Sequence, residues 1–161
     1  MKRLFVNLDL CIGCLACQQA CAMTHRGNTA LRFGEIAGTR LAPSVCRQCV
    51  QATCVSACPV GALVRTDDGV VVRSEIACIG CLSCAAACPF GALSEQLDGE
   101  RVVTKCDNCE ERLSRGLEPA CVATCPTGAR LFLEVAEVIE GKHGVMVGAA
   151  SLRLAPSEEG S

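Results

Sequence analysis

The chain has 161 residues, a formal charge of −2 and no tryptophan or tyrosine. Its length allows one domain or two very small ones, and its scattered basic residues do not indicate a nucleic-acid-binding face. Sixteen residues are cysteines, about a tenth of the chain, a density typical of disulfide or metal scaffolds. No apolar run approaches the roughly 18 residues of a membrane helix. The segment before Cys11 lacks the apolar core of a secretory signal, which argues against a disulfide framework.

The first half of the chain alternates short strand patterns with cysteine-rich loops. Residues 3–9, RLFVNLD, predict a strand, and the first cysteine group, CIGCLACQQAC, follows with a short helical stretch before its last cysteine. Residues 22–45 contain three glycines and a proline and are interpreted as a loop. Residues 62–74 predict a hairpin that turns at Asp68–Gly69.

The second half repeats elements of the first. Residues 92–105 predict another hairpin, which turns at Asp98–Gly99, and the segment after Phe132 predicts a brief amphipathic helix ending near Gly141. The tail, 155–161, is predicted to be disordered. Three versions of one element, CPVGAL at 58–63, CPFGAL at 88–93 and CPTGAR at 125–130, mark an internal repeat.

The cysteines fall into four groups of four, with none left over. In sequence order the groups are Cys11, Cys14, Cys17 and Cys21; Cys46, Cys49, Cys54 and Cys58; Cys78, Cys81, Cys84 and Cys88; and Cys106, Cys109, Cys121 and Cys125. Groups one and three carry three cysteines at x2 spacing and a fourth after x3, the run typical of bacterial iron–sulfur ligation. Group four alone, C-x2-C-x11-C-x3-C, also suits structural zinc, which uses two cysteine pairs. The four groups together favour iron–sulfur clusters over zinc.

The x3 spacing predicts that ligands are exchanged between clusters, because the fourth cysteine of each run in two-cluster ferredoxins binds the other cluster. Groups two and three are close in sequence and form one pair, so groups one and four pair across them. Four [4Fe–4S] clusters are therefore predicted. Their ligands are Cys11, Cys14, Cys17 and Cys125 for cluster 1; Cys46, Cys49, Cys54 and Cys88 for cluster 2; Cys78, Cys81, Cys84 and Cys58 for cluster 3; and Cys106, Cys109, Cys121 and Cys21 for cluster 4. Group one departs from the repeat, because Ala22 and not proline follows Cys21.

This pairing predicts the domain organisation. Residues 1–41 plus 104–140 form a first ferredoxin-like unit, residues 42–103 form a second unit inserted into it, and residues 141–161 are a C-terminal tail. The predicted fold class is α+β: two interleaved bacterial ferredoxin-like units of short hairpins and short helices. Four phenylalanines are the only aromatic residues, so iron–sulfur clusters are expected to fill much of each core.

Residues 3–133 resemble the four-cluster ferredoxin-like electron-transfer subunits of multi-subunit oxidoreductases. The resemblance rests on the order of the four groups, the widened second group and KCDNC followed by a long gap to the next cysteine. It supports the exchange of ligands and implies a catalytic partner. That partner is expected to be a tungsten or molybdenum pterin enzyme such as an aldehyde oxidoreductase, with carbon monoxide dehydrogenase or hydrogenase as alternatives, and a flavin- or nicotinamide-linked subunit is the expected acceptor.

The second cysteine group departs from this family pattern. Family members usually carry His or Asn near the second cysteine and prolines before the third. Here Gln48, Gln51, Ala52 and Thr53 stand in that loop. We therefore expect local hydrogen bonding around this group to differ from that of the family.

No catalytic residue is predicted. All cysteines are assigned as ligands, there is no G-x-G-x-x-G or P-loop, and His25 and His143 are interpreted as exposed loop histidines. Lys105 either is solvated or raises the potential of the cluster bound by Cys106. The ligand-free stretches 22–45 and 110–120 favour a docked subunit over a diffusible polyferredoxin serving several partners. Cytoplasmic location is expected, with export on a signal-bearing partner left open.

Overall fold

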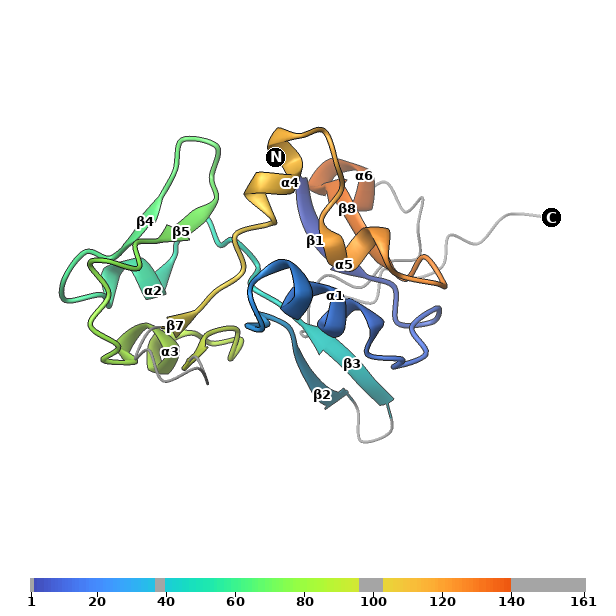
Figure 1. Cartoon of the computed structure of the whole chain (residues 1–161), viewed down its shortest axis with the longest axis horizontal. Coiled ribbons are helices and arrows are strands. Elements are labelled where there is room, and N and C mark those ends of the chain that lie inside the picture. The colour runs from blue at the N-terminus through green and yellow to red at the C-terminus, as the bar shows by residue number, and fades with distance from the viewer. Residues whose placement is uncertain (1, 37–39, 96–102, 140–161) are drawn as a thin grey trace.

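The structure, a computed structural model, describes residues 2–36, 40–95 and 103–139 (Figure 1). The strands are β1 Lys2–Val6, β2 Arg32–Ile36, β3 Arg40–Ser44, β4 Leu63–Arg65, β5 Val71–Arg73, β6 Ser94–Glu95, β7 Val103–Thr104 and β8 Arg130–Glu134. The helices are α1 Ala16–Thr24, α2 Thr53–Ser56, α3 Ser83–Ala87, α4 Glu110–Ser114, α5 Ala120–Ala123 and α6 Val135–Ile139. The strands form four antiparallel two-stranded sheets, β1–β8, β2–β3, β4–β5 and β6–β7. The fold is therefore a mixture of short helices and short strands.

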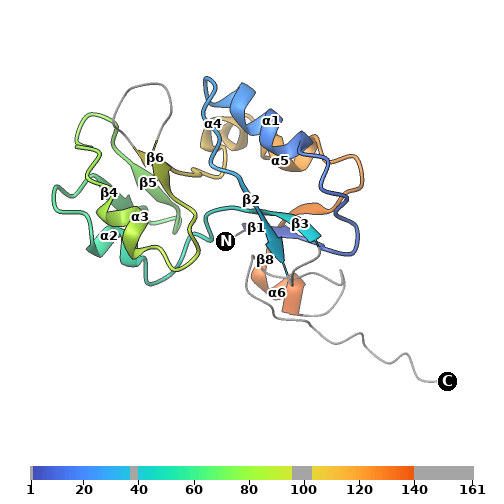
Figure 2. The same cartoon turned by 90° about the horizontal axis from the view of Figure 1, so that it is seen from below.

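Figures 1 and 2 show two lobes side by side. The first lobe holds α1, α4, α5, α6, β1, β2, β3 and β8, and the second holds α2, α3, β4, β5, β6 and β7. The β1–β8 sheet joins the two ends of the described residues, with Lys2 opposite Glu134 and Val6 opposite Arg130. Helix α1 packs on α5 in the first lobe, and α2 packs on α3 in the second. In the described part of the protein no helix is long and apolar enough to cross a membrane.

Most of the predicted elements are confirmed. Residues 62–74 form the β4–β5 hairpin, and its turn is closed by a hydrogen bond of 2.8 Å from the Gly69 N–H to the Thr66 carbonyl. Gly69 has a φ of 78°, which its missing Cβ permits. The second predicted hairpin exists as β6–β7, but its turn at Asp98–Gly99 lies outside the described residues. The same holds for the end of α6 near Gly141 and for the C-terminal tail.

The prediction that residues 22–45 form a loop is wrong. The segment contains the end of α1 and the β2–β3 hairpin, in which Gly34 pairs with Ala42 and Phe33 with Pro43. Glycine and proline are poor residues for a central strand, but both strands of a two-stranded ribbon are edge strands. An edge strand tolerates a proline because the missing N–H can face solvent. The glycine and proline that predict a loop here, Gly34 and Pro43, are therefore compatible with this two-stranded hairpin.

Cysteines make up much of the interior. The largest apolar core of the described residues contains Leu4, Cys17, Cys21, Ala30, Leu31, Val45, Cys46, Ala92, Cys106 and Cys121. A second core lies in the second lobe and contains Leu63, Val71, Cys84, Leu93 and Val103. Phe5 and Val138 form a small third core where α6 covers the β1–β8 sheet. Thiols thus occupy places that larger side chains fill in ordinary domains.

Candidate metal centres

The four cysteine groups share one backbone feature. The residue just before the second cysteine has a left-handed backbone in every group, with φ of 67° at Gly13, 50° at Gln48, 65° at Gly80 and 60° at Asn108. This conformation curls each loop, so that cysteines at x2 spacing can converge on one point. Groups one and three use glycine there, which adopts this backbone without strain. Groups two and four use longer polar residues, which require compensation.

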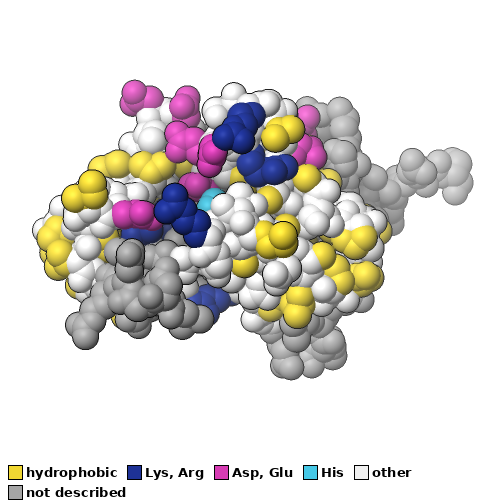
Figure 3. Space-filling model, in the orientation of Figure 1, with side chains coloured by type: hydrophobic (Ala, Val, Ile, Leu, Met, Phe, Trp, Pro, Cys, Tyr) yellow, Lys and Arg dark blue, Asp and Glu magenta, His cyan; other side chains and the backbone are white. Residues whose placement is uncertain are grey.

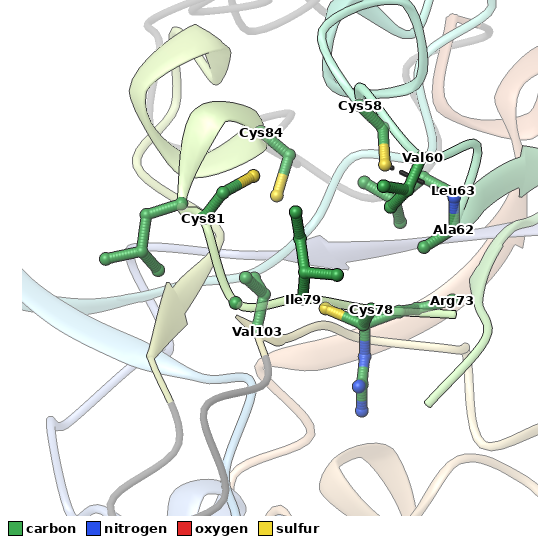
Figure 4. A pocket seen from close by; sticks show the side chains of 12 residues that line it. Cys58, Val60, Ala62, Leu63, Arg73, Cys78, Ile79, Cys81, Cys84 and Val103 are labelled. Carbon is green, nitrogen blue, oxygen red and sulfur yellow. Dashed lines mark hydrogen bonds between the residues drawn. The ribbon is translucent and has the colours of Figure 1, made fainter. Parts of the chain in front are cut away.

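Three cavities of nearly equal size are lined by four cysteines each. Each has a volume of about 20 Å³. The first is lined by Cys11, Cys14, Cys17 and Cys125, the second by Cys46, Cys49, Cys54 and Cys88, and the third by Cys58, Cys78, Cys81 and Cys84. In each cavity one cysteine comes from a different group than the other three. Figure 4 shows the side chains of the third set around their common space, with Ile79 among them.

The remaining four cysteines meet between α1, α5 and the start of α4. Cys21, Cys106 and Cys121 lie in one apolar core, and the Cys109 thiol is close enough to Cys121 and Cys21 to interact with both. All four are buried. The structure thus brings together the same four sets that the spacing predicts, and which set binds which cluster stays a prediction.

The donor chemistry of these sets fits [4Fe–4S] clusters. All sixteen cysteines lie within the described residues and each is a free thiol. Backbone N–H groups already face the sulfurs: Ala62 donates to Cys58 at 3.2 Å and Asn108 to Cys106 at 3.4 Å. Four thiolates with hydrogen bonds to sulfur are the environment that such clusters take.

The thiols differ in their readiness to ionise. Burial raises the pKa of Cys17 and of Cys109 to about 11, and raises that of Cys106 well above its ordinary value. A buried thiolate is costly in an apolar setting unless a cation binds it. The Ser83 hydroxyl lowers the pKa of Cys81, which lies on an exposed loop. A bound metal would therefore supply the positive charge that stabilises the buried thiolates.

His25 is not the exposed loop residue that was expected. It follows α1 and is half-buried, with its Nε2 3.6 Å from the Cys109 Sγ and 3.8 Å from the Asp107 Oδ1. These three groups could bind a single metal ion, but only by competing with a cluster for Cys109. No local signal reveals this contact, because His25 and Cys109 are 84 residues apart. His143 lies outside the described residues.

Gln48 connects the two lobes from a fully buried position, 1% exposed. Its Nε2 donates to the Cys106 carbonyl at 2.9 Å, and its Oε1 accepts from the Val71 N–H at 2.9 Å and from the Lys105 Nζ at 3.3 Å. Lys105 also donates to the Cys106 carbonyl at 2.8 Å, so it is not a freely solvated charge. Hydrogen bonding around group two thus runs through a glutamine that ties cysteine groups two and four together, and the difference from the family stays a prediction.

A much larger polar cleft, of about 580 Å³, opens beside this junction. Its lining includes His25, Arg26, Arg73, Asp107 and Glu111. Figure 3 shows the histidine between acidic and basic side chains on this face of the molecule. Charges of both signs surround the cleft, so it has no single preference for cations or anions.

The sequence matches two protein-family models, a 4Fe-4S dicluster domain over residues 38–135 and a 4Fe-4S binding domain over residues 8–24. It is 33% identical to the probable anaerobic dimethyl sulfoxide reductase chain YnfG of Escherichia coli, over 92% of this chain and 80% of that one. It is 39% identical to the thiosulfate reductase electron transfer subunit PhsB of Salmonella typhi, over 76% of this chain and 70% of that subunit. It is 33% identical to the nitrate-inducible formate dehydrogenase iron–sulfur subunit of Escherichia coli, over 84% of this chain and 55% of that subunit. The match therefore spans about half of the last relative.

Proposed function

Because this protein belongs to the family of 4Fe-4S dicluster proteins, we propose that it relays electrons through four [4Fe–4S] clusters inside an oxidoreductase complex. The convergence of all sixteen thiols into four sets within one small molecule carries this proposal. We assign no active site to the chain itself, since the relatives are named as chains or subunits of reductases and dehydrogenases. Those names favour a fixed subunit over a diffusible polyferredoxin.

The proposed ligand sets follow the sequence prediction. Clusters 1, 2 and 3 would occupy the three cavities, and cluster 4 would lie between Cys21, Cys106, Cys109 and Cys121. The close approach of these four thiols supports the last assignment. The two lobes support two proposed ferredoxin-like units, 1–41 plus 104–140 and 42–103, but the boundary at residue 42 falls inside β3, which belongs to the first lobe. Val103, near one proposed crossing, begins β7, while Ala42, near the other, lies within β3.

The packing supports one continuous path, in the order cluster 1, cluster 4, cluster 2, cluster 3. Cys17 of cluster 1 and Cys121 of cluster 4 share the largest apolar core, where α1 packs on α5. Cys106 of cluster 4 and Cys46 of cluster 2 share the same core. Clusters 2 and 3 share the second lobe, where α2 packs on α3. Each step thus joins neighbours, and the path crosses between lobes only once.

Clusters 1 and 3 would then be the ends where electrons enter and leave. Cys14 and Cys81 are the two exposed cysteines, and each belongs to a CIGCL loop. Ile12 and Ile79, at matching places in these loops, are 68% and 60% exposed. Figure 3 shows hydrophobic side chains exposed toward both ends of the long axis. Apolar side chains beside a terminal cluster suit a docking surface for another protein.

We assign one end to a catalytic subunit, with a tungsten or molybdenum pterin enzyme favoured and carbon monoxide dehydrogenase or hydrogenase as alternatives. The other end would serve an acceptor subunit, flavin- or nicotinamide-linked. Anaerobic affinity capture of the tagged protein, followed by mass spectrometry, should recover such a catalytic subunit. Capture of no oxidoreductase, or turnover of a metabolite by the protein alone, would contradict the proposal.

Two variants test separately whether each end of the path binds a partner. Ile12→Glu should release the partner bound at cluster 1 and leave the other in place, and Ile79→Glu should do the reverse. Met23→Glu is the matched control, because Met23 is 77% exposed on α1 without lining any of the three cysteine cavities. Loss of both partners in either variant would argue against two separate docking ends.

A further inference from the structure

Arg130 breaks the internal repeat at a buried position. The three copies of the repeat end in Leu63, Leu93 and Arg130, each five residues after the cysteine that begins its copy. Leu63 is 3% exposed, Leu93 is 6% exposed and Arg130 is 3% exposed. A guanidinium group therefore occupies a site that the two other copies fill with an apolar side chain. Burying a charge in such a site is strongly unfavourable unless the charge is compensated.

The contacts of Arg130 identify what compensates this charge. Its Nη2 lies 3.6 Å from the Sγ of Cys121, a proposed ligand of cluster 4. Arg130 also lines the cavity of cluster 1, where its backbone N–H faces the Cys125 thiol and its charge acts on the Cys17 thiol. The residue therefore lies between the proposed ligands of two different clusters.

Arg130 lacks the partner that a structural arginine usually has. Among the described residues no carboxylate pairs with it, and its buried Nε has no hydrogen-bond partner. Two other arginines line cluster cavities, and each has a side-chain partner other than a cysteine. Arg73 pairs with Glu75 at 3.0 Å, and Arg47 stacks on the Phe90 ring at 3.7 Å. Among the described residues, the groups found near the Arg130 guanidinium are the thiols of Cys121, in the set of cluster 4, and Cys17, in the set of cluster 1.

We infer that Arg130 is a positioning residue that raises the reduction potentials of clusters 1 and 4 together. Reduction adds negative charge to a cluster, and a fixed positive charge beside it stabilises the reduced form. A dry interior strengthens this effect, because water is not present to screen it. The first hopping step of the proposed path would then join two clusters whose potentials are lifted by the same side chain.

A smaller observation agrees with this placement. Burial raises the pKa of the Cys17 thiol, and the Arg130 guanidinium opposes that rise. Cys17 belongs to the set of cluster 1, whereas Cys121 belongs to the set of cluster 4. The guanidinium therefore acts on sulfurs of both sets.

The repeat itself suggests the test variant. Arg130→Leu copies the residue of the two other repeats, so the site should still pack. Anaerobically reconstituted wild-type and variant proteins would be titrated with dithionite and followed by electron paramagnetic resonance. We expect two of the four couples to shift downward, with the ratio of reduced to oxidised cluster falling about tenfold at a fixed potential, which is about 59 mV for a one-electron couple. The other two couples should stay in place.

Three further variants make the outcome decisive. Arg130→Lys keeps the charge and should keep the potentials close to those of the wild-type protein, whereas Arg130→Gln keeps a donor without the charge and should behave like the leucine variant. Arg3→Leu is the control, because Arg3 also has a buried Nε without a partner but lines none of the three cavities. Unchanged couples in both neutral variants, or an equal shift in Arg130→Lys, would overturn the inference.

This inference rests on the proposed function, since it needs clusters 1 and 4 to be present. The proposed function and the role of Arg130 are contradicted by different results. An iron content well below that of four cubanes in the wild-type protein would contradict the proposed function. Full iron content in both neutral variants with wild-type potentials would contradict the role of Arg130 alone.

Discussion

Gln48 illustrates how a single residue can hold an unfavourable backbone. A left-handed conformation costs a residue with a Cβ roughly 1 kcal/mol, and Gln48 has a φ of 50°. Asn108 has the matching place in group four and a φ of 60°, and the two side chains lie 3.4 Å apart. Both side chains are buried, and Gln48 has four polar partners. The hydrogen bonds between lobes offset the strain within each loop.

Gln48→Ala should therefore weaken the junction of the two lobes. It leaves the buried Val71 N–H without its acceptor, at about 1–3 kcal/mol for an unsatisfied group. It also removes one of the two acceptors of Lys105, which keeps its bond to the Cys106 carbonyl. We expect a lower midpoint for the heat-induced loss of the cluster absorbance under anaerobic conditions. Gln51→Ala is the control, because Gln51 lies in the same loop but is exposed. Equal midpoints for both variants would show that the buried bonds contribute nothing.

At the scale of single elements, the cysteine loops are defined by their left-handed positions. Gly80 has a φ of 65° and precedes the second cysteine of its group, as Asn108 does in group four. Asparagine adopts this conformation more readily than other residues with a side chain.

Gly80→Ala should accordingly destabilise cluster 3 by roughly 1 kcal/mol, while Gly80→Asn should do so less. The measurement is the rate at which iron is lost to a chelator at raised temperature. The asparagine variant serves as the matched control, since it adds more bulk than alanine. Faster iron loss from the asparagine variant than from the alanine variant would indicate that the rate depends on side-chain bulk and not on backbone strain.

Helix α1 carries cysteines of two proposed clusters, Cys17 of cluster 1 and Cys21 of cluster 4. Cys21→Ser should therefore perturb the spectrum of the cluster held by Cys106, Cys109 and Cys121. The cluster of Cys11, Cys14 and Cys17 should change less. Because both thiols are fixed on one continuous helix, they cannot exchange roles. An experimental structure with Cys21 and Cys11 on one cluster would refute the pairing.

At the scale of the whole molecule, cluster binding and folding are expected to be coupled. Five of the ten residues of the largest apolar core are cysteines, and the described strands form only two-stranded sheets. Two-stranded sheets are marginally stable by themselves. Without iron the buried thiols would leave cores with few large side chains, so metal binding supplies much of the folding free energy.

The iron-free protein should consequently be largely unfolded, and the loaded protein should hold about sixteen irons and sixteen sulfides. Far-ultraviolet circular dichroism and anaerobic metal analysis test both statements. A cooperative melting of the iron-free protein near that of the loaded protein would contradict the coupling. Stoichiometric zinc in the anaerobic protein would contradict the cluster assignment.

The clusters also change the charge of the molecule. Each oxidised cubane with four thiolates adds roughly −2 to the formal −2 of the residues. Association with a catalytic partner should therefore weaken as salt is raised, because the partner's docking face needs compensating lysines and arginines. Binding measured at several salt concentrations, with the iron-loaded protein, tests this. An affinity that is independent of salt would mean that the apolar loop tips carry the contact alone.

The chemistry of this protein, the grouping of its cysteines and most of its short elements can be predicted from the sequence alone, because they depend on spacing over a few residues. The three cavities that are each lined by four cysteines contain the same sets that the x3 spacing predicts. The contacts between different cysteine groups depend on tertiary packing and could not be predicted. The bond from Gln48 to Cys106 spans 58 residues, and the contact of His25 with Cys109 spans 84. The β2–β3 hairpin was missed because its glycine and proline are acceptable only in a ribbon with two edges. The place of Arg130 between two cysteine sets likewise depends on α1, α5 and β8 packing together, which no local pattern encodes.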